Sequence, residues 1–567
     1  MKKNKIKIST IIILSLCVLA CLLLLIPQVQ EIIIKMIEQF IVHRVIDHVI
    51  WYKYLSTLSI IGVFIFCIRL YILFANINLK KYFLFIENEI QKIDRKKFII
   101  SILCMFGLYT LGIASIIRAD FLYVDDLGRA ILGYRGWENW SRYVNSFLSI
   151  FIHADTHLTD ISPLPQLIAA FLMAIASVLL VYIICDGKIT KTACFLSLPI
   201  GLSPYFLECF SYRFDSPYMA LSVLICIIPF LFIRNYLVFS ICSIISLLIM
   251  FTTYQASSGI YIIIVIILCF KAWNERKTTV KEIFRFVGVS VLSCGAAMIF
   301  FRFFLMRSIN TNNYVSLDTY PINELFSGIF HNFMLLIRIV DADFGLIWKV
   351  LLILSFLMFV ITSVLFTKRN KIIVFFVSSL VIISMSALSL GTYLVLIDSF
   401  FAPRAMLGFG IFIACISIYL SNVPNKYFSI PAVLLCWSFF VFSLSYGNAL
   451  SDQKRYNNFR TEILLHDLSI LFPDRSEGPL SIIVWNHVGF APSIYNIADR
   501  NPIILRLVPR ELGGGSFWGE LFLRRYYDFN LQFDDGITFK EVGLNKIFDS
   551  YYHTIKSDGK NILVILK

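Results

Sequence analysis

Two adjacent carboxylates, Asp125 and Asp126, lie in the first long polar stretch of the chain, directly after an apolar run. A carboxylate beside a like charge has a raised pKa, which suits a general base that works near neutral pH. Transfer of a group from a phosphate to a hydroxyl needs such a base, and also cations that hold the leaving phosphate. We therefore predict that Asp125 or Asp126 is the base. The alternative is that Asp126 caps a helix that begins at Leu127, while Asp125 is solvated.

Arginines near the acidic pair and in a later connection are candidate ligands of that phosphate. Arg129 and Arg142 follow the pair, and the motif ECFSYRFDSPY contains Glu208, Arg213 and Asp215. A guanidinium group can clamp a phosphate with two hydrogen bonds, and a carboxylate can orient the guanidinium. We predict phosphate or substrate binding by this set. The alternative is an internal ion pair of Arg213 with Asp215 or Glu208 that fixes the loop.

Two further clusters have the same chemistry. Arg404 ends the motif DSFFAPR and begins an apolar run, so it is either a second phosphate contact or an arginine that snorkels to the membrane surface. The long connection 306–345 contains Arg338, Asp341 and Asp343, which form a comparable but weaker cluster.

A metal site is not predicted. His153, Asp155, His157 and Asp160 include two histidines at i, i+4 spacing, which can share one face of a helix. Nothing like a zinc-protease motif surrounds them, so we interpret the stretch as a polar loop. The chain also shows no Ser-His-Asp order, phosphate-binding glycine loop or dinucleotide glycine pattern, and we predict neither a metal nor a cofactor.

The elements that must position these residues are membrane spans. The chain has 567 residues, 58% of them hydrophobic, with a mean hydropathy of +0.79. A helix needs about 20 apolar residues to cross a bilayer, so the fold class is an all-α polytopic membrane protein, and a soluble globular protein is excluded. About thirteen spans are predicted, near residues 8–27, 57–75, 98–117, 163–185, 192–206, 217–233, 236–252, 259–271, 286–305, 346–367, 372–396, 405–420 and 428–446.

The net charge of +14 has its source in the short connections between these spans. Basic residues mark the cytoplasmic side of a membrane protein, so their distribution predicts a cytoplasmic N-terminus. The segment 118–160 then faces the periplasm or the cell exterior, and the tail 447–567 lies on the same outer side. No nucleic-acid partner is indicated. The basic connections include Lys80-Lys81, Lys92–Lys97, Arg276-Lys277 and Lys368–Lys371.

The segment 137–151 has aromatic and aliphatic residues at helical spacing, with polar residues on the other face. It is too short and too polar to cross the bilayer, so we predict one surface helix in the headgroup layer that sets the height of the acidic pair.

The tail 447–567 loses the apolar character of the preceding 1–446, which we predict to be the transmembrane domain. Residues 456–471 are typical of an amphipathic helix, and 481–485, 502–508 and 561–566 are typical of short strands. The tail is therefore predicted to be a small α+β domain.

The motif VDDLGR, the W-x-x-W segment with Arg142, and YRFDSPYMALS together resemble the bacterial membrane glucosyltransferases that modify O-antigen and convert serotype. The resemblance covers roughly residues 98–420. It implies a GT-C-type fold in the bacterial inner membrane and a polyprenyl-phosphate-glucose donor, which a partner transferase makes and a flippase delivers. It also implies transfer to a lipid-linked O-antigen repeat on the periplasmic face, with Asp125 or Asp126 as base.

The leading hypothesis is thus an inverting, metal-independent glycosyltransferase whose outer domain stacks on sugar rings. A transporter is the main rival, but it should have charged positions near the middle of the bilayer in paired halves, whereas the ionisable residues here lie at the outer ends of spans. An O-antigen polymerase, which would join whole repeats, is the second alternative. The aromatic residues proposed for stacking are Trp485, Phe517, Trp518, Tyr526 and Tyr527.

Overall fold

The computed structural model describes residues 79–306, 318–473, 480–513, 522–523, 531–533, 544–559 and 561–567. Contacts divide the chain into two units, and of the described residues only 79–92 and 300–306 belong to the first. Helix α4 (Leu79–Gln91) belongs to that unit. The predicted spans 8–27 and 57–75 lie outside the described residues. All other described residues belong to the second unit.

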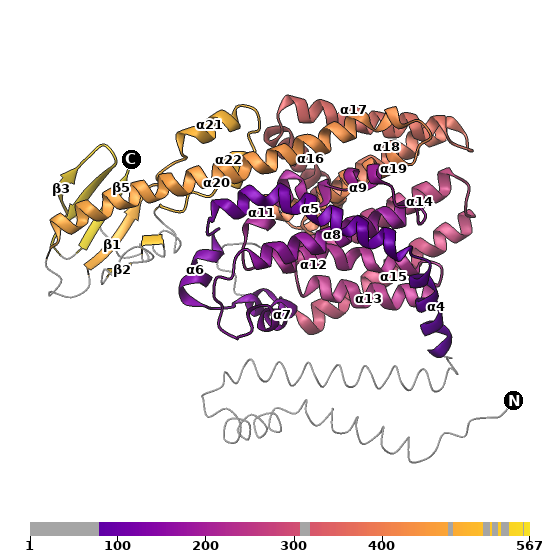
Figure 1. Cartoon of the computed structure of the whole chain (residues 1–567), viewed down its shortest axis with the longest axis horizontal. Helices are drawn as coiled ribbons and strands as arrows, with labels where there is room; N and C mark the ends of the chain where they lie inside the picture. Colours follow the sequence, from indigo (N-terminus) through magenta and orange to yellow (C-terminus); the bar gives the residue numbers. More distant parts are fainter. Residues whose placement is uncertain are drawn as a thin grey trace, which may run out of the picture. The chain divides into compact units, whose positions relative to one another are not determined.

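This unit is mainly helical (Figure 1). Helix α5 packs between α20 and α8, and α8 packs in turn against α12, so that residues far apart in the sequence form one bundle. The helices are α5 (Arg95–Ala119), α6 (Asp125–Leu132), α7 (Tyr143–His153), α8 (Leu164–Ile184), α9 (Lys191–Leu196), α10 (Pro199–Leu202), α11 (Pro204–Ser211), α12 (Ser216–Ile227), α13 (Tyr236–Phe251), α14 (Ser258–Asn274), α15 (Val280–Phe300), α16 (Leu325–Asp343), α17 (Leu346–Leu365), α18 (Lys371–Leu388), α19 (Gly408–Ser421), α20 (Ile430–Leu471), α21 (Pro492–Ala498) and α22 (Ile504–Leu507).

Nine helices of the described chain are long and apolar enough to cross a membrane, or ten if one bent pair counts as a span. Eight of the nine coincide with predicted spans, which supports a polytopic membrane protein. The predicted spans 217–233 and 236–252 correspond to shorter apolar helices, Ser216–Phe232 and Tyr236–Phe251. The count of thirteen therefore stays a prediction.

The ninth helix, α16, corrects the interpretation of 306–345 as a loop. Before it, Tyr320 N donates to Val395 O, and within it Asn332 donates to Leu396 O. At its end, Asp343 pairs with Arg506, which also donates to Phe401 O. The segment before α16 and its residue Asn332 thus contact the connection 391–404, and its last residue, Asp343, is linked to the same connection through Arg506. Apolar composition alone does not distinguish such a helix from a span.

The predicted span 192–206 is a broken helix. Lys191–Leu202 and Pro204–Ser211 form a pair bent by 61°. The residue before a proline is disfavoured in the α region, and Ser203 accordingly has extended backbone ahead of Pro204. The bend directs α11 and the connection 212–215 toward the segment that begins α6.

The segment 137–151 is not one helix, which corrects that prediction. A 3₁₀ helix, Trp137–Trp140, ends at Ser141 in the left-handed region (φ 59°), and α7 begins separately at Tyr143. Trp137 is fully buried, whereas Phe147 and Phe151 are exposed on α7. The aromatic residues therefore divide between an inward-facing indole and an outward-facing phenylalanine pair.

Helix α20 joins the bundle to the C-terminal region (Figure 1, orange). Its 42 residues span about 63 Å, roughly twice the hydrocarbon thickness of a bilayer. The predicted span 428–446 and the predicted helix 456–471 are thus one continuous helix, and the predicted domain boundary at 446 lies inside it.

The C-terminal region contains a five-stranded sheet with the order β2-β1-β5-β4-β3. Strand β1 is parallel to β2 and β5, while β4 is antiparallel to β5 and β3. The predicted strands 481–485 and 561–566 are confirmed, but 502–508 contains the short helix α22. A short apolar run does not separate a buried strand from a buried helix. The strands are β1 (Leu480–Trp485), β2 (Leu531–Phe533), β3 (Asn545–Asp549), β4 (His553–Ser557) and β5 (Asn561–Leu566).

The core of this sheet region includes two residues from the acidic loop. Leu122 and Leu127 are buried in the same apolar cluster as Ile482, Val564 and Leu512. Burying a leucine side chain stabilises by about 1.5–3 kcal/mol, so the sheet region holds both flanks of the acidic pair.

Candidate active site

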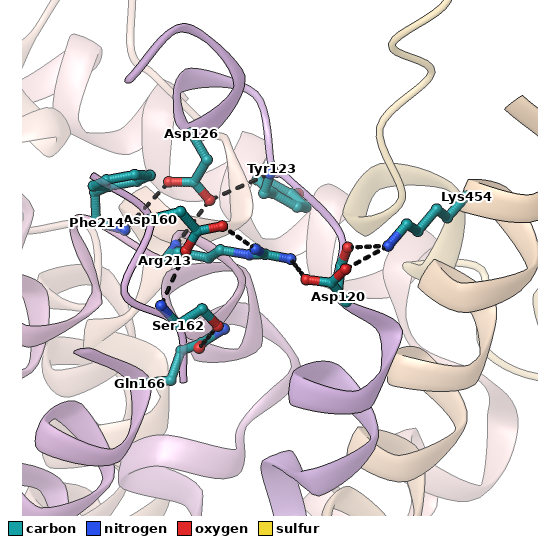
Figure 2. Close-up of polar contacts among 9 residues, drawn as sticks. All are labelled: Asp120, Tyr123, Asp126, Asp160, Ser162, Gln166, Arg213, Phe214 and Lys454. Atoms are coloured by element: carbon teal, nitrogen blue, oxygen red, sulfur yellow. Dashed lines mark hydrogen bonds and ion pairs between the residues drawn. The ribbon is translucent and has the colours of Figure 1, made fainter. Parts of the chain in front are cut away.

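The acidic pair begins helix α6, and its two members have different surroundings. Asp126 is fully buried, and its carboxylate accepts from the backbone N–H groups of Tyr123 (3.2 Å), Arg213 (2.8 Å) and Phe214 (3.3 Å). Figure 2 shows these contacts. Asp126 therefore connects the loop before α6 to the connection between α11 and α12. Like the helix cap predicted from the sequence, Asp126 accepts from backbone N–H groups, but these groups belong to two different loops.

Burial raises the pKa of Asp126 to about 7, against the lowering effect of the Arg213 backbone N–H. The nearby Asp215 carboxylate raises it further. Since all its close partners are backbone donors, Asp126 is well placed to fix the loop and poorly placed to reach a substrate.

Asp125 has no hydrogen-bonding partner for its carboxylate among the described residues, and it is only partly buried. Burial raises its pKa, while Arg129, Arg404 and Arg142 lower it. It is thus a carboxylate with a raised pKa and free lone pairs, on which three arginines act electrostatically. Of the two aspartates, it has the properties of a general base.

Two of those cations lie around one tyrosine. The Arg142 guanidinium stacks 4.8 Å from the centre of the Tyr254 ring, and its Nε donates to Gln255 (3.4 Å). The Tyr254 hydroxyl donates to the backbone carbonyl of Arg404 (3.3 Å). Tyr254 therefore contacts the guanidinium of Arg142 with its ring and the backbone of Arg404 with its hydroxyl, and both arginines act electrostatically on Asp125.

Glu208 orients Arg404. Its carboxylate accepts from the Arg404 guanidinium (2.5 Å) and from the Arg404 backbone N–H (2.6 Å). The guanidinium also lies over the rings of Tyr212 and Phe400, each 5.4 Å away. Because α11 brings Glu208 to this position, the broken helix has a direct consequence for the site.

Arg129, on helix α6, and Asp215 form a buried ion pair. The Trp137 indole N–H also donates to Asp215, and the Arg129 guanidinium lies 4.6 Å from the centre of the Trp137 ring. Arg129 is thus committed to Asp215, so its predicted role as a phosphate ligand gains no geometric support.

Arg213 is likewise committed, but not to the partners that the sequence indicated. Its guanidinium pairs with Asp160 and Asp120, and Asp120 pairs in turn with Lys454 of α20 (2.7 Å; Figure 2). With Asp126 bound to its backbone, Arg213 ties the acidic loop to three segments. The alternative of a structural ion pair fits these contacts, with different carboxylates.

Arg338 lies outside this cluster. It is exposed on α16 and makes no polar contact with another described residue. Its neighbours Asp341 and Asp343 pair with Lys349 and Arg506 instead. The weaker cluster predicted in 306–345 is therefore not brought to Asp125 by any contact in the described chain.

The stretch 153–160 supplies structural contacts. The His153 ring stacks on Phe214, Asp155 accepts from the backbone of Thr156 and His157, and Asp160 pairs with Arg213. Within the described residues, no group of three or more metal-ligating side chains lies close enough to hold a metal ion.

Four residues of the site were not predicted from the sequence: Tyr254, Gln255, Asp120 and Glu511. Tyr254 and Gln255 lie in the short connection between two predicted spans at the same end of the bundle, which was the available signal. Glu511 lies in the sheet region, and nothing in its local sequence points to the acidic loop. Of the proposed stacking aromatics, only Trp485 is among the described residues.

Residues 114–415 match the family described as Glucosyl transferase GtrII, and this match covers more than half of the 567 residues. The chain belongs to this family. The matched residues include all nine side chains predicted for the site, and the resemblance to O-antigen glucosyltransferases is confirmed. Membership in the GtrII family makes the chain a glucosyltransferase, and its apolar helices make it a membrane protein.

One known protein is similar to this chain over most of its own length. It is a protein of Salmonella phage P22 described as "Uncharacterized 55.3 kDa protein in gtrB 5'region". It is 26% identical over 484 residues, covering 78% of this chain and 94% of the relative. No solved structure matches the chain.

Proposed function

We propose that this GtrII family member transfers glucose from a polyprenyl-phosphate-glucose donor to lipid-linked O-antigen repeats at the periplasmic face of the bacterial inner membrane. The observation that carries the proposal is the partly exposed Asp125, whose carboxylate has no hydrogen-bonding partner among the described residues, together with Arg142 and Arg404, which both contact Tyr254. A lipid-borne phosphate sugar and a lipid-borne acceptor would meet at this level of the membrane.

In the proposed reaction, Asp125 accepts the proton of an acceptor hydroxyl as its oxygen attacks the anomeric carbon of the donor. The bond between that carbon and the phosphate oxygen breaks, and its electron pair stays on the phosphate. Arg142 and Arg404 stabilise this charge through guanidinium hydrogen bonds. Attack opposite the leaving group inverts the anomeric centre, which fits a GT-C-type enzyme.

The remaining predicted residues then have positioning roles. Glu208 holds Arg404, Asp215 holds Arg129, and Asp126 with Arg213 fixes the loop in front of Asp125. Arg142 and Arg404 also have polar partners, Gln255 and Glu208, but these two arginines are partly exposed, whereas Arg129 and Arg213 are buried. We therefore assign the donor phosphate to Arg142 and Arg404.

The acceptor glycan would approach from the sheet region. Arg510 is exposed there, one residue from Glu511, which accepts from the Val124 backbone N–H. Its guanidinium lies 5.3 Å from the Phe490 ring, and Tyr495, in edge contact with Phe490, is 52% exposed. An arginine and exposed rings suit sugar hydroxyls and sugar faces. The partners of the pathway are the transferase that makes the donor and the flippase that delivers it.

The experiment supplies membranes containing the protein with polyprenyl-phosphate-[¹⁴C]glucose and measures label in lipopolysaccharide. The proposal predicts labelled product whose mass rises by one hexose per repeat. A change in chain length without added hexose would indicate the polymerase, and movement of intact donor without transfer would indicate the transporter.

A further inference from the structure

One short segment of the sheet region contacts the loop that bears Asp125. The Tyr123 hydroxyl donates to the Leu507 carbonyl (2.7 Å), and the Val124 backbone N–H donates to the Glu511 carboxylate (3.2 Å). Tyr123 and Val124 are the two residues that immediately precede the acidic pair. Residues 506–511, which we name the strap, therefore hold the loop that bears Asp125.

The strap also contacts the connection that bears Arg404. The Arg506 guanidinium donates to the Phe401 carbonyl, three residues before Arg404. The same guanidinium pairs with Asp343, whose carboxylate also accepts from the Tyr205 hydroxyl (2.9 Å). Both halves of the proposed site, the base and one phosphate ligand, are thus bound to six consecutive residues.

The backbone at Val124 shows why the loop needs such a contact. Val124 has φ 46° and ψ −100°, which is a rare conformation for a β-branched residue. Such a conformation persists only where surrounding contacts determine it. The Val124 N–H bond to Glu511 is one of those contacts, and the burial of Leu122 and Leu127 in the sheet core is another.

We propose that the strap sets the distance between the base and the phosphate ligands, with Glu511 as the positioning residue for Asp125. This proposal rests on the proposed function, because it assigns Asp125 as the base. It makes the sheet region part of the transferase site rather than an independent module. The sheet region would then affect catalysis without touching the donor.

Hydrogen–deuterium exchange on the full-length protein in nanodiscs tests the placement without any activity measurement. Glu511→Met keeps the side-chain length and removes the acceptor, whereas Glu511→Gln keeps one acceptor oxygen. We expect the peptide that contains Val124 and Asp126 to exchange at least tenfold faster in Glu511→Met and at the wild-type rate in Glu511→Gln. Glu462→Ala, which changes an exposed carboxylate on α20, is the matched control and should leave exchange unchanged.

Transfer kinetics with polyprenyl-phosphate-[¹⁴C]glucose provide the second readout. Glu511→Met should lower kcat about tenfold and leave the KM for the donor unchanged, and Glu511→Gln should restore kcat. Wild-type exchange and wild-type kcat in Glu511→Met would overturn the positioning role. If the wild type itself transferred no glucose, the proposed function would fail, while the exchange result would still decide whether Glu511 holds the loop. Size-exclusion chromatography confirms that each variant is folded.

Discussion

The two ends of the helical bundle both carry buried charges, but they use them differently. One end contains the C-terminus of α8. There, Lys271 donates to the Ile184 carbonyl and to Asp186 (2.9 Å), and Asp186 also pairs with Lys277 (2.6 Å). Arg369 donates to the Trp273 carbonyl and stacks on its ring. Every one of these cations has a partner inside the protein.

At the opposite end, the described aspartates of the network differ from one another in their partners. Asp120, Asp126, Asp160 and Asp215 all have cationic or backbone partners, whereas Asp125 has none among the described residues. A paired charge stabilises the fold, but a partnerless carboxylate with a raised pKa is costly unless it does something else. The difference between the two ends is therefore the strongest structural argument for where the chemistry occurs.

The largest effect should follow from removing that carboxylate. Asp125→Asn should lower kcat by about 10²- to 10⁴-fold, because a general base contributes that much. Asp126→Asn keeps one acceptor oxygen for the backbone donors, so it should reduce kcat less and lower the midpoint of thermal unfolding instead. Purified variants in the labelled-donor assay and in thermal melts check both outcomes. Equal losses of kcat would remove the distinction between the two aspartates.

Loss of a phosphate ligand should have the next largest effect. Arg142→Ala should lower kcat about 10²-fold, as expected for one donor to a developing oxyanion. Arg142→Lys keeps the charge without the planar two-donor geometry, so it should restore only part of the rate. Donor-dependent kinetics measure this, and a normal kcat in Arg142→Ala would exclude the arginine from the leaving-group site.

The pH dependence distinguishes the two aspartates further. Asp125 works as a base only when it is ionised, and burial raises its pKa. The kcat should therefore rise with pH and reach its plateau above the ordinary pKa range of carboxyl groups. At pH values below the pKa of Asp125, kcat should fall about tenfold per pH unit.

Asp126 should affect stability in the same pH range. Its pKa is about 7 in the folded protein, against an ordinary value of 3.8, so the folded state binds the extra proton between these values. Stability should therefore fall as pH rises from about 4 to 7, and Asp126→Asn should abolish that slope. Thermal melts across this range, with Asp120→Asn for comparison, check the sign.

A smaller effect is expected for the acceptor. Arg510→Ala should raise the KM for the acceptor about fivefold, since a lost hydrogen bond costs about 1 kcal/mol, and should leave the KM for the donor unchanged. Initial rates at varied acceptor concentration measure it. An increase in the KM for the donor alone would contradict the assignment of Arg510 to the acceptor.

The opposite end of the bundle should give the smallest effect on transfer. Lys271→Met breaks the ion pair with Asp186, whose side chain is 56% exposed and still has Lys277 as a partner. The free energy of unfolding should therefore fall by only about 1 kcal/mol. The kcat should stay within about twofold of wild type. A large loss of transfer would contradict the contrast between the two ends.

The sequence predicted much of the bundle because apolar length is a strong signal. Most spans, two strands and the clustering of charges at one end were visible in it. The break at Ser203 and the left-handed Ser141 were not predicted, because they depend on local backbone geometry. Helix α16 was missed because its apolar run was assigned to a connection.

The sequence predicted which residues could belong to the site, but not which of them contact one another. The sequence brought Asp125, Arg142 and Arg404 into consideration, yet it could not separate Asp125 from Asp126. That separation depends on the backbone N–H groups of Arg213 and Phe214, almost ninety residues away. It could not anticipate Glu511 either, since a contact across 387 positions leaves no local pattern.

Chemical rescue tests the assignment of the base most directly. Asp125→Gly and Asp126→Gly are each assayed with polyprenyl-phosphate-[¹⁴C]glucose while the concentration of formate is raised. Formate should restore transfer in Asp125→Gly in a concentration-dependent manner, because a small carboxylate can occupy the vacated position, and it should not restore transfer in Asp126→Gly. Full transfer by Asp125→Gly without formate, or rescue of Asp126→Gly alone, would contradict the account.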